Sequence, residues 1–259
     1  MESVCRVALN GIDLTDLDRD ITIRDVAEHP PVMRNAVYPL AGGGSVMTGQ
    51  KRESLTVEVL VDIAGRSPLH RQLLMDKLAG WCGSGRLTLS SRPDRYLQVV
   101  CEEGPVPGSH RRWTDPVRLR FTAFAVPYWQ HMTAACASSP NAKQHTLSLP
   151  VGGTADKTVL EADITFAQSP EKIILRTEFS FMELTAPDIP AGGMLTIRQD
   201  AWGRTVISAE KSGETTSRMA CRTIASSDRL EIACGRTNII RLESDRDIAV
   251  TIRARGLDK

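Results

Sequence analysis

The sequence lacks the residue clusters on which most metal sites and disulfide frameworks are built. Its 259 residues include 6 cysteines, and no Cys-x-x-Cys motif or cluster of cysteine with histidine occurs. A chain of this length can bury a core without cross-links. We therefore expect reduced thiols that pack as small apolar side chains. The cysteines are Cys5, Cys82, Cys101, Cys136, Cys221 and Cys234.

Long apolar stretches and a net charge are also missing. A run of roughly 18 apolar residues, which a membrane-spanning helix needs, occurs nowhere. Lys+Arg at 32 against Asp+Glu at 31 leaves a formal charge of +1, which gives no general attraction to nucleic acid or an anionic membrane. The first residues show no positive region followed by an apolar run, so we expect no signal peptide. These absences predict a protein that folds in a cytoplasm and leaves it only as part of something larger.

Catalytic and ligand-binding motifs are absent as well. The 5 histidines are scattered, without an H-E-x-x-H pair. The glycine-rich segment 42–45 lacks the lysine of a phosphate-binding loop, and no G-x-S-x-G hydrolase motif is present. The aspartates in segment 13–20 lack the glycine and the terminal glutamate of a calcium loop. The sequence therefore predicts no enzyme activity, no cofactor and no metal site.

The first half of the chain shows local signals for strands and for one helix. Asn10-Gly11 separates two short apolar runs, which predicts a β-hairpin. Apolar residues alternate with polar ones over 55–63, the period of a half-buried strand. Ser67 and Pro68 are typical of a helix start and predict a helix over 68–81. The predicted apolar face of this helix consists of Leu69, Leu73, Leu74, Leu78 and Trp81.

A segment without regular patterning separates the early strands from this helix. Pro30, Pro31 and Pro39 interrupt any helix, and the glycines of segment 42–45 add flexibility. A long irregular segment inside a compact domain is usually functional or interfacial. We therefore predict an extended arm at about residues 30–52.

The second half changes to short strands separated by turn residues. The small-residue stretch 133–141 predicts a boundary between domain 1–132 and domain 133–259. Strands spaced by roughly ten residues are typical of a β-sandwich. The candidate strands are 145–149, 159–166, 173–177, 179–184, 195–199, 205–208, 229–233, 238–242 and 248–254.

The order of these elements resembles the distal tail protein family of long, flexible-tailed bacteriophages, the baseplate hub of the siphovirus tail. The likeness covers nearly the whole chain and depends on the order of motifs that are individually weak. In the first half the motifs are Leu55–Ile63, the helix 68–81, Arg86–Leu89, Asp94–Tyr96, Val117–Phe121 and Val126–Trp129. In the second half they are Leu149–Thr154, Leu195–Asp200, Ser226–Asp228, Cys234-Gly235 and Val250–Gly256.

The resemblance implies a mainly β protein with an α+β N-terminal domain. That domain is expected to be a ring-forming sheet or barrel with one helix, followed by a galectin-like β-sandwich. It also implies a hexameric ring, possibly stacked, at the distal end of the virion tail. The expected partners are the tail tube protein and a tail-tip or receptor-binding protein, with assembly in the bacterial host cytoplasm.

A ring of this kind needs contacts between different surfaces of neighbouring copies, and a reaching arm suits that geometry. The candidate self-assembly residues of the arm are Val32, Arg34, Val37, Tyr38 and Leu40.

Two other functions compete with the structural one. The chain could be a carbohydrate-binding adhesion module for host cell-wall polysaccharide, with Trp202 as the sugar contact. A single tryptophan in a sandwich more often packs in the core or a turn, and the sugar-binding residues of true galectins are not evident here. A hydrolase without a recognisable motif is the third alternative.

Overall fold

The structure is a computed structural model that describes residues 5–105, 116–187, 189, 192–200 and 203–259, with only the backbone described at positions 30, 50 and 51. The fold is mainly β, as the sequence predicted, and it divides into two compact units, Met1–Trp129 and Gln130–Lys259. Each unit encloses its own apolar core. No helix in the described part of the chain is long and apolar enough to cross a membrane.

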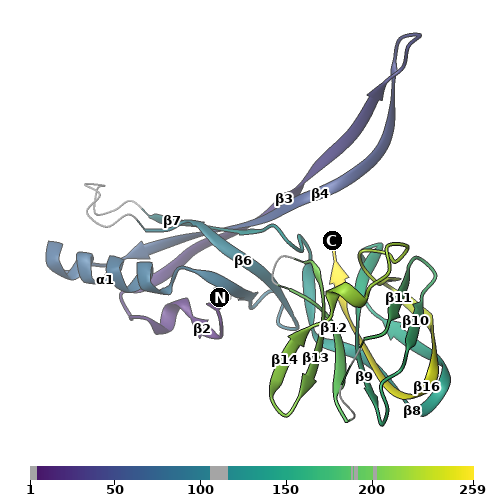
Figure 1. The fold of residues 1–259 in the computed structure, drawn as a ribbon. Coiled ribbons are helices and arrows are strands. Elements are labelled where there is room, and N and C mark those ends of the chain that lie inside the picture. The colour runs from purple at the N-terminus through teal and green to yellow at the C-terminus, as the bar shows by residue number, and fades with distance from the viewer. Residues whose placement is uncertain (1–4, 106–115, 188, 190–191, 201–202) are drawn as a thin grey trace. The chain divides into compact units, whose positions relative to one another are not determined.

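The first unit is an antiparallel sheet with one helix, α1 (Pro68–Trp81) (Figure 1). Its strands pair in the order β3–β4–β7–β6–β5–β1–β2. A short 3-10 helix, Leu14–Asp16, follows β2. The strands are β1 (Val7–Leu9), β2 (Ile12–Asp13), β3 (Ile21–Pro39), β4 (Ser45–Ile63), β5 (Ser84–Leu89), β6 (Arg95–Glu103) and β7 (Val117–Ala123).

Local sequence signals place several of these elements correctly. Asn10 and Gly11 both have positive φ, at 53° and 82°, and form the turn of the predicted hairpin. The predicted strand 55–63 is the second half of β4, and its alternating apolar residues 55, 57, 59, 61 and 63 are buried against the core. Ser67 caps α1 by accepting a hydrogen bond from the backbone N–H of His70 at 3.1 Å.

The predicted apolar face of α1 is partly wrong. Leu74, Leu78 and Trp81 are buried, together with Met75, which the prediction omitted. Leu69 and Leu73 are instead 71% and 52% exposed. Because each residue turns the helix by roughly 100°, positions 69 and 73 lie far around the helix from the buried stripe.

The second unit contains nine strands and a second 3-10 helix, Met219–Cys221, among its described residues. Its main path is β14–β13–β12–β9–β16–β8, with β10 between β11 and β16 and with β15 on β9. All nine predicted segments overlap strands, although β14 was not predicted. The strands are β8 (Trp129–Val151), β9 (Lys157–Phe166), β10 (Lys172–Arg176), β11 (Phe181–Thr185), β12 (Met194–Gln199), β13 (Thr205–Lys211), β14 (Glu214–Ser217), β15 (Glu231–Ala233) and β16 (Arg236–Asp258).

Segment 133–141, where we predicted the boundary between the domains, is part of a strand. It lies within β8, a strand that continues from Trp129 to Val151. The division between the two compact units falls between Trp129 and Gln130. Small residues and Pro140 are accommodated in β8 because this part of the strand is largely exposed and packs few side chains into the core.

Segment 30–52 is also more regular than predicted. Strands β3 and β4 run through it as one antiparallel hairpin, closed by a turn over 40–44 in which Leu40 N–H donates to the Gly44 carbonyl at 3.0 Å. Register shifts fall between His29 and Val32 and between Ala36 and Val37. Pro31 falls within the first shift, where no ladder hydrogen bond is lost. These shifts and the absence of a core against the hairpin explain why the sequence shows no strand periodicity there.

Candidate functional site

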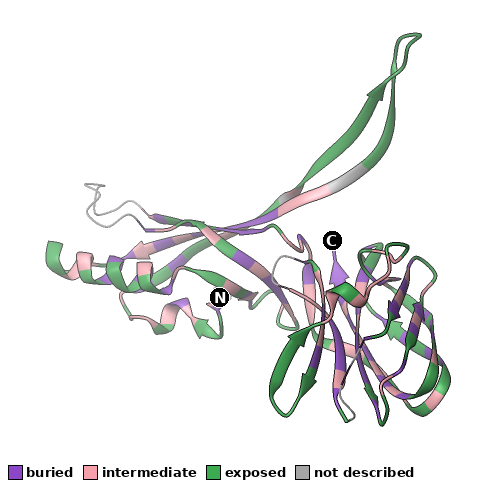
Figure 2. Ribbon diagram, viewed as in Figure 1, coloured by how far each residue is buried: buried purple, intermediate pink, exposed green. Residues whose placement is uncertain are grey.

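The outer part of the β3–β4 hairpin, residues 32–54, is the candidate functional site, and we call it the arm. Figure 2 shows it as an exposed two-stranded extension. Seven of the 16 exposed large apolar side chains found in the described residues lie on it. They are Val32, Met33, Val37, Tyr38, Leu40, Val46 and Met47, with exposed fractions from 44% to 66%.

A two-stranded hairpin with exposed apolar side chains gains little stability from its own contacts. An isolated two-stranded hairpin is marginally stable in water, because it lacks a third strand or a layer to bury its side chains. A concentration of exposed apolar side chains marks an interaction surface. The arm therefore has the properties of a segment that a partner would cover.

Both faces of the arm are apolar near its turn. Val37 lies opposite Met47, and Tyr38 lies opposite Val46. Successive residues of a strand point to opposite faces, so the two pairs occupy the two sides of the hairpin. A segment that lay on one flat surface would need only one apolar face. The arrangement therefore suits an arm that is enclosed from both sides.

The arm begins at a fixed base within the first unit. Trp129 is 1% exposed, and its indole Nε1–H donates to Glu28 Oε2 at 3.1 Å. Arg92 donates two hydrogen bonds, both of 3.1 Å, to the same carboxylate and lies 5.0 Å above the Trp129 ring. Strand β3 is thus held just before it leaves the core.

The opposite strand is held in a similar way. Arg52 donates a hydrogen bond to the Pro127 carbonyl at 3.4 Å and lies 4.5 Å above the ring of Tyr128. The motif Val126–Trp129, which carried part of the family resemblance, therefore secures both strands at the base of the arm. Sequence inspection gave no signal for this, because the contacts join residues that are far apart in the chain.

The predicted arm residues lie along β3, except Leu40, which lies in the turn after it. Val32, Val37, Tyr38 and Leu40 are all exposed on the arm, and Arg34 pairs with Glu53 at 3.2 Å. Met33, Val46 and Met47 were not predicted. Their apolar side chains in the same segment were the available signal, which the apparent irregularity concealed.

Trp202, the candidate sugar contact, lies outside the described residues. Among the described residues of the second unit, a hollow of about 460 Å³ is lined by two arginine–aspartate pairs and other residues. Arg204 pairs with Asp200 at 2.8 Å, and Arg222 pairs with Asp228 at 3.2 Å. The carboxylates of this hollow are therefore already engaged by neighbouring cations.

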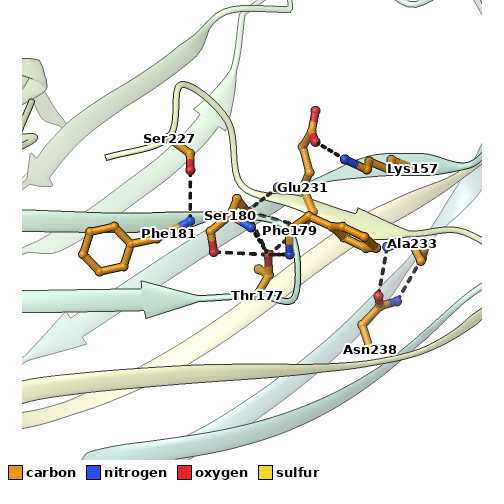
Figure 3. Close-up of polar contacts among 9 residues, drawn as sticks. All are labelled: Lys157, Thr177, Phe179, Ser180, Phe181, Ser227, Glu231, Ala233 and Asn238. Atoms are coloured by element: carbon orange, nitrogen blue, oxygen red, sulfur yellow. Dashed lines mark hydrogen bonds and ion pairs between the residues drawn. The ribbon is translucent and has the colours of Figure 1, made fainter. Parts of the chain in front are cut away.

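An exposed aromatic ring of the second unit is engaged as well (Figure 3). Phe179 is 39% exposed, but the ammonium of Lys157 lies 4.5 Å and the guanidinium of Arg236 5.6 Å from its ring centre. Thr177 Oγ1 accepts hydrogen bonds from the backbone N–H groups of Phe179 and Ser180, at 3.2 and 3.0 Å. This turn joins β10 to β11 and fixes it against β15. The Phe179 ring therefore takes part in contacts that stabilise this turn.

Metal-binding chemistry has no candidate in the described part of the chain, where no group of three His, Cys, Asp or Glu side chains could hold an ion. Among the described residues, the arm is therefore the feature that most calls for a function.

Comparisons with known proteins identify the fold. No protein-family model and no curated protein sequence matches the chain. Among solved structures, the chain is similar to the Dit (gp 19.1) protein of phage SPP1, a paradigm of the hub adsorption apparatus in phages that infect Gram-positive bacteria. The similarity covers 98% of this chain and 99% of the SPP1 protein, at 15% identity and a TM-score of 0.66. A chain of the phage P2 baseplate in its activated conformation with Ca is similar over 98% of both chains, at 10% identity and a TM-score of 0.54. The same baseplate with Sr gives 96% and 97% coverage, 11% identity and a TM-score of 0.52. The chain therefore has the fold of phage distal tail and baseplate hub proteins, which confirms the resemblance found in its sequence.

Proposed function

We propose that the chain is a structural protein of a phage tail, which forms a hexameric ring at the distal end and joins the tail tube to the tail-tip or receptor-binding apparatus. The observation that carries this proposal is the arm, with its apolar side chains on both faces. The similarity to hub and baseplate proteins along the whole chain supports the location.

The arm supplies the kind of contact that a ring needs. A cyclic assembly with more than two members uses two different surfaces of each copy, one that reaches and one that receives. Burial of one large apolar side chain contributes roughly 1.5–3 kcal/mol. The seven exposed apolar side chains of the arm therefore provide on the order of 10 kcal/mol in each contact, before the costs of association.

The proposal assigns the chain no catalytic step. Host recognition, in this view, belongs to proteins mounted on the ring. The ring and its partners would reach the virion by assembly in the host cytoplasm.

Deletion of residues 35–48 tests the role of the arm. The shortened chain should remain folded, because the deleted segment packs against neither core, and it should be monomeric where the full chain forms rings. Light scattering after gel filtration, with negative-stain imaging of the main peak, measures the outcome, and far-UV circular dichroism checks the fold. Intact rings after the deletion would overturn the role of the arm.

The ring itself has a separate test. A full-length chain that stays monomeric at high concentration, and also when mixed with its tail tube protein, would contradict the proposed assembly. A closed sixfold ring in images of either sample is the expected result.

A further inference from the structure

Two cysteines of the first unit lie side by side where α1 passes into β5. Cys82 caps the C-terminus of α1, with its N–H bonded to the Leu78 carbonyl at 3.0 Å. Cys101 lies in β6, and its N–H donates to the Gly83 carbonyl at 2.9 Å. The ladder between β5 and β6 begins at the next pair, Ser84 opposite Val100. The two cysteines are thus neighbours across the end of one hairpin.

The side chains of the pair converge on the same point. An ideal Cβ on Gly104 would lie 3.8 Å from the sulfur of Cys101 and 3.9 Å from the sulfur of Cys82. Both sulfurs therefore lie beside Gly104. Both cysteines are partly exposed free thiols, so a small reagent can reach them.

The surroundings make the two thiols unequal. The hydrogen bond from the Cys82 thiol lowers the pKa of Cys101, although partial burial opposes this. The same hydrogen bond and the burial raise the pKa of Cys82. Cys101 is therefore the more acidic thiol of the pair and the first to form a thiolate.

We propose that Cys82 and Cys101 form a reversible intramolecular disulfide when the protein meets a small disulfide oxidant such as oxidised glutathione. The Cys101 thiolate attacks one sulfur of the oxidant, forms a mixed disulfide and releases one reduced thiol. Cys82 then loses its proton and attacks the Cys101 sulfur, which releases the second reduced thiol. The two protein thiols are oxidised, and the oxidant disulfide is reduced to two thiols.

The bond would tie the end of α1 to the sheet. Trp81, the residue before Cys82, packs edge-on against Phe121 at 5.8 Å between ring centres and donates its indole N–H to the Ile12 carbonyl. A cross-link between residues 82 and 101 reduces the conformational entropy of the unfolded chain. It should therefore raise the melting temperature of the first unit by roughly 5–10 °C. The chemistry is independent of the proposed function. Only its timing, with reduced thiols in the host and oxidation after the particle is released, rests on that function.

Mass spectrometry of the full-length chain tests the proposal. The protein is incubated with oxidised glutathione, and the remaining free thiols are then blocked with an alkylating reagent. The intact mass should be that of a chain that has lost two hydrogens and carries the reagent on its other cysteines. Peptide mapping should identify a link between Cys82 and Cys101. A stable glutathione adduct on either cysteine, or a link that joins other cysteines, would overturn it.

Cysteine variants provide a second test, in which the change in melting temperature on oxidation is measured. The increase in melting temperature on oxidation should be present in the wild type and in Cys5→Ser, a matched control in the same unit with a partly exposed thiol. It should be lost in both Cys82→Ser and Cys101→Ser, each compared with its own reduced form. An increase that persists in either of these variants would contradict the pairing, whatever their basal stability.

Discussion

The indole of Trp129 donates a hydrogen bond of 3.1 Å to the carboxylate of Glu28, and this contact fixes the position from which the arm departs. Arg92 donates two further hydrogen bonds to the same carboxylate. Beyond this point β3 loses its core, while its pairing with β4 continues to the turn. The arm thus starts from a position that these hydrogen bonds fix. This restricts the orientations that the arm can adopt before it contacts a partner.

Replacement of Glu28 by Ala should destabilise the first unit by about 1–3 kcal/mol, because the buried indole N–H and the Arg92 guanidinium both lose their acceptor. Glu28→Gln retains a carbonyl oxygen for the indole and should cost less. Urea unfolding followed by tryptophan fluorescence measures the difference. Glu53→Ala is the matched control, since Glu53 pairs with the exposed Arg34 and should cost well under about 1 kcal/mol. Equal losses for Glu28→Ala and Glu53→Ala would contradict the anchoring role.

The two faces of the arm can be tested separately. Val37→Ser with Met47→Ser changes one face, and Tyr38→Ser with Val46→Ser changes the other. If the arm is enclosed from both sides, each pair should weaken ring association by tenfold or more, about 1.4 kcal/mol. Analytical ultracentrifugation over a concentration series measures it.

Monomer stability should hardly change in either pair of arm variants, because all four side chains are exposed. A loss confined to one pair would mean that the arm lies on a single surface. Ile239→Ser, an exposed isoleucine in the second unit, is a control for general loss of surface apolarity.

Helix α1 offers a direct check on which of its residues belong to the core. Leu78→Ala should cost about 2–5 kcal/mol, because the side chain is fully buried and its loss leaves a cavity. Leu69→Ala should stay within about 0.5 kcal/mol in the monomer, since that side chain is 71% exposed. Thermal or denaturant unfolding of the monomer measures both. Comparable losses at the two positions would show that the helix face is misassigned.

Acid should weaken the second unit through Asp245. Burial opposes ionisation of this carboxyl, but the backbone N–H groups of Lys172 and Glu171, each 2.9 Å from Oδ1, outweigh it and lower the pKa. A carboxyl with a lowered folded-state pKa contributes stability above its unfolded value, which is near 3.8, and loses it as pH falls through the folded value. The contribution should therefore be complete at neutral pH, begin to fall at about pH 4 and be lost below the folded-state pKa.

Melting temperatures between neutral pH and about pH 3 measure this contribution. Asp245→Asn should show a flatter decline on acidification than the wild type, from a lower starting value. The matched variant is Asp247→Asn, an exposed position in the same strand. Parallel pH profiles for the wild type and Asp245→Asn would refute the assignment.

Direct glycan binding distinguishes the structural function from its main competitor. We expect the purified chain to show no specific binding to host cell-wall polysaccharide, because the carboxylates of the hollow that Asp200 lines pair with arginines and the Phe179 ring already contacts two cations. Calorimetry or a pull-down with purified cell walls measures it. Binding that disappears in Trp202→Ala would favour the carbohydrate-binding alternative.

Local features of the fold were readable in the sequence because they depend on neighbouring residues. The Asn10-Gly11 turn, the Ser67 cap of α1 and the alternation of 55–63 are each decided within a few positions. The exposed apolar residues of the arm were also visible as residue types. Their organisation into a paired hairpin was not, because bulges and missing core contacts removed the expected period.

The sequence by itself determined the mainly β character, the single helix and the order of elements that resembles distal tail proteins. Only the tertiary structure decided that β8 continues through the small-residue stretch, that Leu69 and Leu73 face away from the core, and that Glu28, Arg92 and Trp129 meet at the base of the arm. It also decided that Cys82 and Cys101 are neighbours. The physical reason is that strand pairing and core packing join residues distant in the chain, and residue type and spacing do not specify which distant partners meet.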